Sequence, residues 1–125
     1  IITSNFTEMY NFYKDVMGFK VKMELESFVE FESEGVRFAI STADVMAQAT
    51  GEESYKEEKK GHSFELAFNC ETPLGVDESY NSLTGKGAKP IKAPADMPWG
   101  QRTAFFADPD DNIHEVFANL PNANN

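Results

Sequence analysis

The sequence is poor in cysteine and in basic residues. Its single cysteine, Cys70, cannot form an internal disulfide and provides no cysteine spacing typical of a metal site. We therefore expect a protein of a reducing cytoplasm. Only 11 Lys and Arg accompany 21 Asp and Glu, for a formal charge of −10. Because the one basic run, residues 56–60, contains its own acids, the composition argues against a nucleic-acid partner or an anionic membrane surface.

Several other patterns are missing. No apolar run approaches the ~20 residues needed to cross a bilayer, so no membrane partner is expected, and no signal peptide is recognisable. There is no Ser-His-Asp order, and Gly85-Lys86-Gly87 lacks the spacing of a phosphate or dinucleotide loop. The sequence opens at Ile1 without Met, which leaves room for upstream residues.

What is present is typical of a globular protein with one aromatic-rich domain. Hydrophobic residues make up 41% of the 125 residues, and there are eleven Phe. The most informative stretch reads as strand, turn, strand over residues 101–107, 108–111 and 112–118. Strand alternation places Glu115 on the same face as Ile113 and Phe117, so we expect this carboxylate in a pocket or on a greasy surface.

The first half of the chain predicts a strand end at residues 1–3, a helix over 5–17 and three strands. Asn5 with Glu8 matches a capping box, and Gly18 is suited to a left-handed helix end. Alternating apolar residues predict strands at 19–26, 29–32 and 36–41. Residues 43–60 are polar and predict a linker or mobile loop with a short helix near 44–48.

The second half repeats this pattern. It predicts a strand at 64–69, a helix from Thr72 to Gly85 or Gly87, a strand at 88–93 and a loop at 94–100 before the terminal hairpin. The two halves are offset by about 67 to 69 residues. We therefore predict an α+β fold of two βαβββ modules forming a curved, mostly antiparallel open sheet, with helices on its convex side and a concave side for a ligand. Within one domain, the boundaries are module one 1–42, linker 43–60, module two 61–119 and tail 120–125.

Two stretches resemble a known superfamily. Residues 12–19, Phe-Tyr-Lys-Asp-Val-Met-Gly-Phe, are similar to the helix-to-strand junction of the vicinal oxygen chelate superfamily, which includes glyoxalase I, bleomycin-resistance proteins and extradiol dioxygenases. Residues 108–115 resemble its Asp-Pro-Asp-Gly-Asn-x-x-Glu ending, and the preceding residues 99–102 also fit. Asp111 stands where Gly is usual, and Asp tolerates a left-handed backbone better than most residues.

The resemblance implies a metal site with ligands from the first and last strands of each module. It assigns Glu115 as a metal ligand and catalytic residue, and Glu65 as a second ligand where family enzymes commonly have His. The last strand of module one offers Arg37, Ala39 and Ser41, none a convincing ligand, and the fourth position lies upstream of Ile1. A divalent Zn, Ni, Mn or Fe ion would then stabilise a developing oxyanion. Without a metal, one of the two neighbouring carboxylates could act as a general base.

Other residues keep two interpretations each. Arg102 could bind an anionic ligand, hold Glu115 charged or form a structural ion pair. Trp99 could line the pocket rim, a dimer contact or the core. Phe105 and Phe106 point to opposite faces, and we assign Phe106 with Trp99 and Arg102 to substrate binding. His62 and His114 are expected to be surface or helix-side residues rather than ligands, and Cys70 is not a nucleophile.

The sequence thus predicts a homodimeric protein of the glyoxalase and bleomycin-resistance type that binds a small molecule. One hypothesis is a metal-dependent lyase or isomerase similar to lactoylglutathione lyase, or a dioxygenase-like enzyme. The alternative is a binding protein that sequesters a drug or metabolite, for which an acidic pocket and a charge of −10 favour a cationic ligand.

Overall fold

The computed structural model describes residues 1–122 and divides the chain into two compact units, Ile1–Gly61 and one that begins at His62. The elements of the first unit are β1 (Ile2–Thr3), α1 (Phe6–Asn11), the π-helix η1 (Phe12–Val16), β2 (Val21–Leu25), β3 (Phe28–Phe31), β4 (Phe38–Thr42), α2 (Ala43–Thr50) and the 3₁₀-helix η2 (Glu53–Lys56). Those of the second are β5 (Ala67–Asn69), α3 (Pro73–Gly85), β6 (Lys89–Met97), β7 (Gln101–Ala107) and β8 (Ile113–Asn119).

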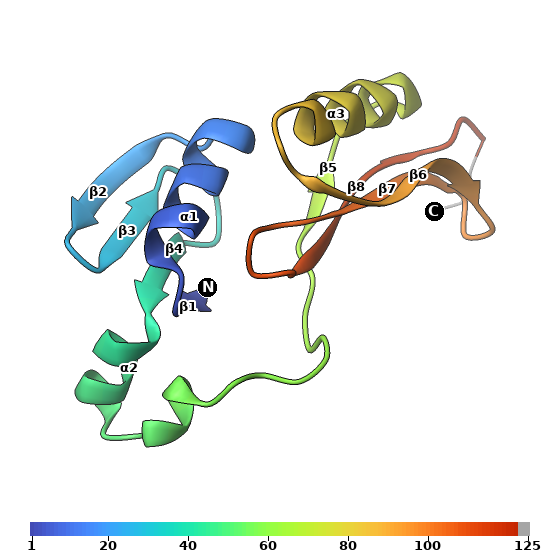
Figure 1. Ribbon diagram of the computed structural model, residues 1–125. Coiled ribbons are helices and arrows are strands. Elements are labelled where there is room, and N and C mark those ends of the chain that lie inside the picture. The colour runs from blue at the N-terminus through green and yellow to red at the C-terminus, as the bar shows by residue number, and fades with distance from the viewer. Residues whose placement is uncertain (123–125) are drawn as a thin grey trace. The chain divides into compact units, whose positions relative to one another are not determined.

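Each unit contains a βαβββ module with one mixed four-stranded sheet (Figure 1). The strand orders are β1-β4-β3-β2 and β5-β8-β7-β6, so the two units share one topology. In each, the first strand pairs in parallel with the last, and the remaining pairs are antiparallel. The predicted α+β class and the repeated βαβββ pattern are therefore confirmed.

The core of the first unit is a cluster of aromatic rings between its helices and its sheet. Tyr13 is fully buried and lies 5.2 Å, centroid to centroid, from Phe38, which stacks on Phe31 at 5.5 Å. The π-helix η1 widens the turn, so the consecutive residues Phe12 and Tyr13 are both buried. The predicted helix over 5–17 is thus continued by η1 after α1, and Gly18 follows with φ of 81°.

The predicted capping box at the start of α1 is wrong. The Asn5 side chain makes no capping hydrogen bond to the backbone and instead donates to Glu8 Oε2 at 2.9 Å. The predicted cap of α3 is confirmed, because Thr72 Oγ1 accepts the Gly75 N–H at 3.0 Å and Pro73 begins the helix. The difference is that the amide of Asn5 turns its donor, not its acceptor, toward the helix.

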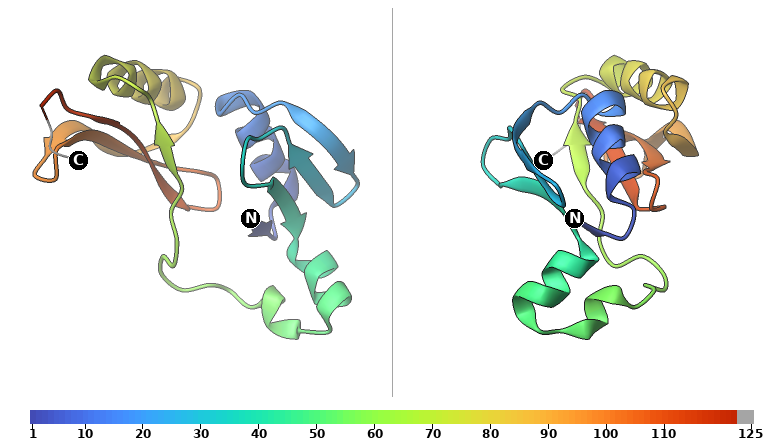
Figure 2. Two further views of the ribbon diagram at one scale, coloured as in Figure 1. Left: turned by 180° about the vertical axis from the view of Figure 1, so that it is seen from behind. Right: turned by 60° about the vertical axis from the view of Figure 1, so that its left-hand side comes forward.

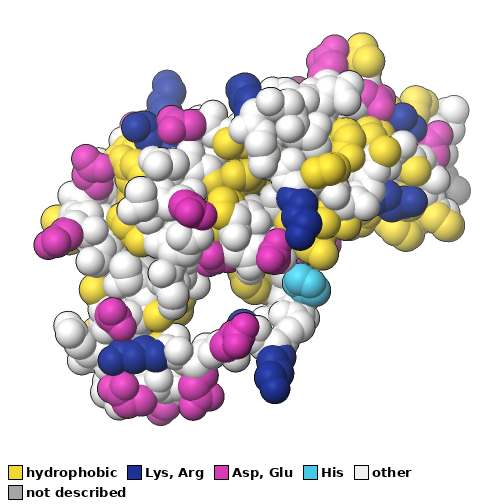
Figure 3. Space-filling view, in the orientation of Figure 1, with side chains coloured by type: hydrophobic (Ala, Val, Ile, Leu, Met, Phe, Trp, Pro, Cys, Tyr) yellow, Lys and Arg dark blue, Asp and Glu magenta, His cyan; other side chains and the backbone are white. Residues whose placement is uncertain are grey.

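The segment predicted as linker contains α2 and η2. Thr42 caps α2, which is longer than the helix expected at 44–48 and ends at Gly51 with φ of 76°. Lys56 lies 3.4 Å from Glu53 within η2 and 3.9 Å from Asp44 of α2, and the second ion pair links η2 to α2. Figure 3 shows acidic and basic side chains interspersed along this segment.

In the second unit, α3 covers one face of the sheet (Figures 1 and 2). Val76 and Leu83 of α3 are buried, as are Ala104 and Phe106 of β7. Two expectations for this unit are corrected. The strand expected at 64–69 begins only at Ala67, and the loop expected from residue 94 is strand up to Met97. The prolines of β6 are tolerated because β6 is an edge strand with register shifts at residues 90–95.

The second unit also forms the turn predicted at 108–111. Asp108 is buried, and its Oδ1 accepts the N–H groups of Asp110 and Asn112, each at 3.0 Å. Asp111 has a φ of 61°, so Asp holds the left-handed position where Gly was expected. The predicted tail reaches residues 123–125, which lie outside the described residues. Among the described residues, no helix is long and apolar enough to cross a membrane.

Two glycines of α3 give a matched test of packing. A Cβ at Gly75 would lie 2.6 Å from the backbone oxygen of Cys70, whereas a Cβ at Gly85 would meet nothing within 4 Å. We expect Gly75→Ala to lower the free energy of unfolding by about 1–3 kcal/mol through overpacking. Gly85→Ala should be neutral or stabilising by up to about 1 kcal/mol. Urea denaturation of both variants checks this, and equal effects would contradict the close approach at Gly75.

Candidate functional site

The candidate site lies on the face of the second sheet that α3 does not cover. Arg102 of β7 bonds to Asp77 of α3, so its side chain marks the helix side. Because successive side chains of a strand point to opposite faces, Thr103 and Phe105 of β7 lie on the side away from α3. Cross-strand pairing adds residues of β8, because Phe105 pairs with Glu115 and Thr103 pairs with Phe117. We call this surface, made by Thr103, Phe105, Glu115 and Phe117, the helix-free face.

Glu115 and Glu65 come together on this face. Ala67 pairs with Glu115 in the parallel β5–β8 ladder, and Glu65 lies two residues before Ala67, where it interacts with Glu115. The pKa of Glu115 is raised, first by burial, then by the negative charge of Glu65 and by a hydrogen bond with its side chain. Two carboxyl groups can hydrogen bond only if one of them carries a proton. The surroundings of Glu115 therefore disfavour the ionised form of its carboxyl.

Thr103 adds a polar group that sequence reasoning missed. Its side chain is fully buried, and its Oγ1 has no hydrogen-bond partner among the residues that the structure describes. A buried hydroxyl without a partner costs about 1–3 kcal/mol, so such groups are rare outside binding sites and strained regions. No motif marks Thr103, since a threonine in a strand is ordinary.

Arg102 does not bond to Glu115. It donates from Nε and Nη2 to Asp77 at 3.0 and 2.8 Å, and from Nη1 to Asp96 at 3.0 Å. The guanidinium holds the pKa of Asp77 below its usual range, and the two carboxylates raise the pKa of Arg102. Of the interpretations offered for Arg102, the geometry matches the structural ion pair, which connects α3 with β6 and β7.

The other predicted substrate-binding residues lie apart from the carboxyl pair. Phe106 is fully buried on the helix side, where its ring lies 6.0 Å from that of His114. The ring beside Glu115 is that of Phe105, which pairs with Glu115 in the β7–β8 register. The sequence alone does not show which of the two consecutive rings faces the helix. Trp99 is 60% exposed in the turn before β7, and its Nε1 donates to Gln101 at 3.0 Å. His62 is exposed.

The donors for a metal ion are incomplete. Within residues 1–122, no three His, Cys, Asp or Glu side chains group in a way that could hold a metal. When the two units are aligned on the N-caps of α1 and α3 and on their parallel strand pairs, Ala39 of β4 takes the position of Glu115. Arg37, also considered there, bonds to Glu30 and lowers its pKa together with Lys22. The first unit therefore has the methyl group of Ala39 where the second unit has the Glu115 carboxyl.

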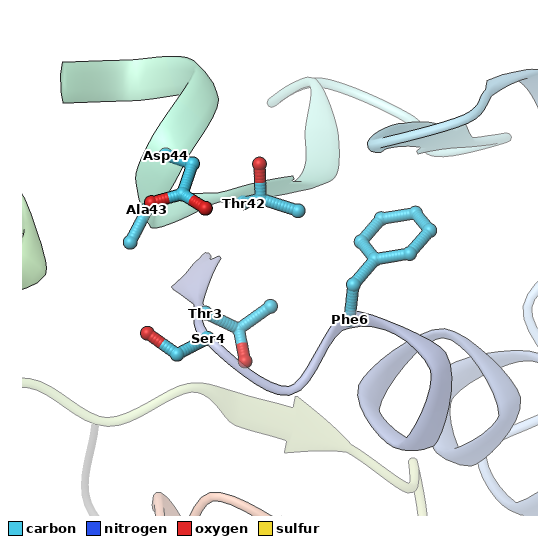
Figure 4. Close-up of a pocket in the computed structure, with 6 residues that line it drawn as sticks. All are labelled: Thr3, Ser4, Phe6, Thr42, Ala43 and Asp44. Atoms are coloured by element: carbon cyan, nitrogen blue, oxygen red, sulfur yellow. The ribbon is translucent and has the colours of Figure 1, made fainter. Parts of the chain in front are cut away.

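A hollow in the first unit contains none of the predicted site residues. It has a volume of about 120 Å³ and is lined by Thr3, Ser4, Phe6, Thr42, Ala43 and Asp44, from the end of β1, the start of α1 and the junction of β4 with α2 (Figure 4). Its Thr3 and Thr42 hydroxyls accept the backbone N–H groups of Asn5 and Val45. These hydroxyls therefore serve local turns, and the candidate site stays with the carboxyl pair.

Comparison with known proteins agrees with this architecture. A family model described as a glyoxalase-like domain matches residues 1–121. The chain belongs to the glyoxalase-like domain family. The resemblance to the vicinal oxygen chelate superfamily is thereby confirmed over nearly the full chain.

This glyoxalase-like chain is similar to a protein from Bacillus subtilis and to several proteins of known structure. It is 32% identical to the Bacillus subtilis protein YraH, named as uncharacterized, over 96% of this chain and 94% of that protein. A glyoxalase/bleomycin resistance protein/dioxygenase from Nocardioides matches with a TM-score of 0.87 and 28% identity, over 98% of this chain and 81% of that one. A lactoylglutathione lyase from Agrobacterium tumefaciens matches with a TM-score of 0.74 and 18% identity, over 94% and 88%, and shows the fold alone.

The raised pKa of Glu115 predicts a specific pH dependence of stability. Below its ordinary value of 4.5, Glu115 is protonated in both the folded and unfolded states. As the pH rises toward the folded pKa, the unfolded state ionises first, so the free energy of unfolding decreases. Glu115→Gln removes this loss, and we expect it to melt above the native protein at pH 7, with the gain disappearing near pH ~4.

The control is Glu65→Gln. Because burial is the largest cause of the raised Glu115 pKa, Glu65→Gln should keep most of the pH dependence of stability that Glu115 causes. Thermal melting from acid to neutral pH measures both variants. A Glu115→Gln curve that runs parallel to the native curve at every pH would show that the Glu115 pKa is not raised.

Proposed function

We propose that this glyoxalase-like protein binds a small molecule on the helix-free face of its second unit. The observation that carries the proposal is that two interacting carboxyls, Glu65 and Glu115, and a buried hydroxyl without a partner among the described residues lie beside two aromatic rings. Ligand sites combine apolar walls with a few well-placed polar groups, and this face has both. Phe105 and Phe117 supply the walls, Glu65 and Glu115 supply polar groups at the surface, and Thr103 supplies a hydroxyl that is buried in the free protein.

The charge of the site favours a ligand with a positive charge or strong hydrogen-bond donors. Burial and the neighbouring Glu65 make ionisation of Glu115 unfavourable, and a cation placed between the carboxyls would offset both effects. The formal charge of −10 works in the same direction at long range, since it raises the local concentration of cations. The proposed role is that of a binding protein that sequesters a drug-like or metabolic amine.

A metal-dependent lyase or isomerase is the second proposal, and the proximity of two carboxylates favours it. Glu65 and Glu115 would hold the ion as hard oxygen ligands, and a divalent ion would supply Lewis acidity. The described residues do not complete the set, because catalytic sites of this kind take three or more protein ligands. In this proposal Glu115 is also the group that accepts or returns a proton, as its raised pKa permits. The predicted homodimer likewise stays a proposal, which light scattering after gel filtration tests.

Thr103 provides a test of the binding proposal. We compare aromatic amines with carboxylic acids that carry the same rings. The amines should raise the melting temperature of the protein, and the acids should not. For an amine that binds, Thr103→Val should weaken the affinity about tenfold through the loss of one hydrogen bond, while Thr103→Ser retains it. Stability of Thr103→Val should stay equal or rise, because the hydroxyl has no partner among residues 1–122 of the free protein.

Fluorescence of the lone Trp99 and calorimetry measure these affinities. A panel in which no amine binds, or in which the acids bind better, would overturn the choice of a cationic ligand. Unchanged affinity in Thr103→Val would show that the hydroxyl does not contact the ligand.

Metal analysis separates the two proposals. If the lyase proposal holds, purified protein retains a divalent ion, or Zn, Ni, Mn or Fe raises its melting temperature, and Glu115→Gln loses the effect. The binding proposal predicts amine binding in chelator-treated protein. Native protein that retains no ion and responds to none of the four would end the lyase proposal.

A further inference from the structure

His114 lies next to Glu115 in the sequence but on the other side of the sheet. It is fully buried on the helix side of β8, among the rings of Phe64, Phe68 and Phe106 at centroid distances of 6.2, 6.3 and 6.0 Å. A buried imidazole among aromatic rings needs hydrogen-bond partners, because desolvation of its two nitrogens is otherwise unfavourable. The partners that it has connect it to the carboxyl pair.

One ring nitrogen of His114 holds the backbone that carries Glu65. Nδ1 accepts the N–H of Leu66 at 3.0 Å, and the carbonyl of the same Leu66 accepts the N–H of Glu115 at 3.0 Å. Both backbone polar groups of Leu66 are thus held by two consecutive residues of β8. The parallel ladder of β5 begins only at Ala67, so the imidazole takes the place of the carbonyl that a longer ladder would supply.

The other ring nitrogen determines which tautomer can do this. Because Nδ1 accepts a hydrogen bond, the ring proton belongs on Nε2, which lies 3.5 Å from Asp108 Oδ2. Asp108 is itself fixed in the hairpin turn, where its Oδ2 accepts the Asn112 side-chain amide at 2.9 Å. A carboxylate beside Nε2 favours the tautomer that carries the proton on Nε2. Carboxylates that accept the free ring N–H of metal-bound histidines fix the tautomer in the same way. The turn, the imidazole and the Leu66 amide therefore form one connected series.

We propose that His114 is a positioning residue for the candidate site: by accepting the Leu66 N–H, it fixes the backbone that brings the Glu65 carboxyl against Glu115. The proposal rests on the proposed function only for its biological meaning, since the geometry it describes is a property of the free protein. It also gives a backbone contact to the segment just before β5, in which Glu65 is exposed and lies outside the strand ladder.

Two variants separate positioning from packing. His114→Leu keeps an apolar side chain of similar size and removes the acceptor, whereas His114→Asn places an amide oxygen near the position of Nδ1. We expect the Leu66 amide to exchange with solvent at least ~10-fold faster in His114→Leu and within ~3-fold of the native rate in His114→Asn. Equal exchange of Leu66 in all three proteins would overturn the proposal.

A double-mutant cycle shows whether the effect reaches the carboxyl pair. In the native background, Glu65→Gln and Glu115→Gln should be non-additive in melting temperature at neutral pH, because the two carboxyls interact. In His114→Leu the two substitutions should become additive, and in His114→Asn the non-additivity should return. Non-additivity of native size in His114→Leu would contradict positioning.

A measurement on the native protein covers the case in which the variants do not fold. With uniform ¹⁵N labelling, a scalar coupling across the hydrogen bond should join the Leu66 amide nitrogen to His114 Nδ1, and the ring shifts should show a proton on Nε2. A proton on Nδ1, or no coupling, would overturn the proposal directly. None of these readouts uses a ligand, so an intact coupling with no amine binding would overturn the choice of a cationic ligand and leave the positioning role standing.

Discussion

The position of β8 between two partners is the constraint on which the second unit depends. β8 pairs in parallel with β5 and antiparallel with β7, so its side chains alternate strictly between the helix side and the helix-free face. A shift of one residue in either pairing would exchange the two sets. His114 and Val116 would then leave the core, and Glu115 would enter it. The register of β8 therefore separates the hydrophobic interior from the acidic site.

The site opposes part of the stability that this arrangement supplies. Burial of Glu115 beside Glu65 disfavours its ionised form, and burial of the Thr103 hydroxyl leaves a polar group without a partner among the described residues. Both features lower the free energy of unfolding in the free protein. A ligand that pairs with the Glu115 carboxyl and the Thr103 hydroxyl would remove both unfavourable contributions and bind more tightly for that reason. Binding sites commonly lower the stability of the free protein in this way. The first unit has the same topology but carries Ala39 at the position of Glu115, so it lacks this carboxyl.

Much of the fold could be predicted from local pattern. Alternation located the strands of both modules to within a few residues, and Thr72 with Pro73 marked the start of α3. The errors have local physical causes. Asn5 uses its amide donor on Glu8, Pro94 is accepted inside an edge strand, and Leu66 gives its N–H to a side chain instead of a ladder. Each of these choices depends on a partner that is distant in sequence or on a side-chain orientation that composition does not reveal.

The sequence by itself determined the βαβββ repeat and the family, because periodicity, turn residues and the 108–115 motif are properties of neighbouring residues. It also singled out Glu115 as the acidic residue among apolar neighbours. Only the tertiary structure decided which ring lies beside that carboxyl, which carboxylates hold Arg102, and that His114 reaches Leu66. Alternation says that Phe105 and Phe106 oppose each other, but only the packing of α3 against β7 shows which of them faces the helix. Side chains from separate strands meet only after the register is formed, and the register is a property of the whole sheet.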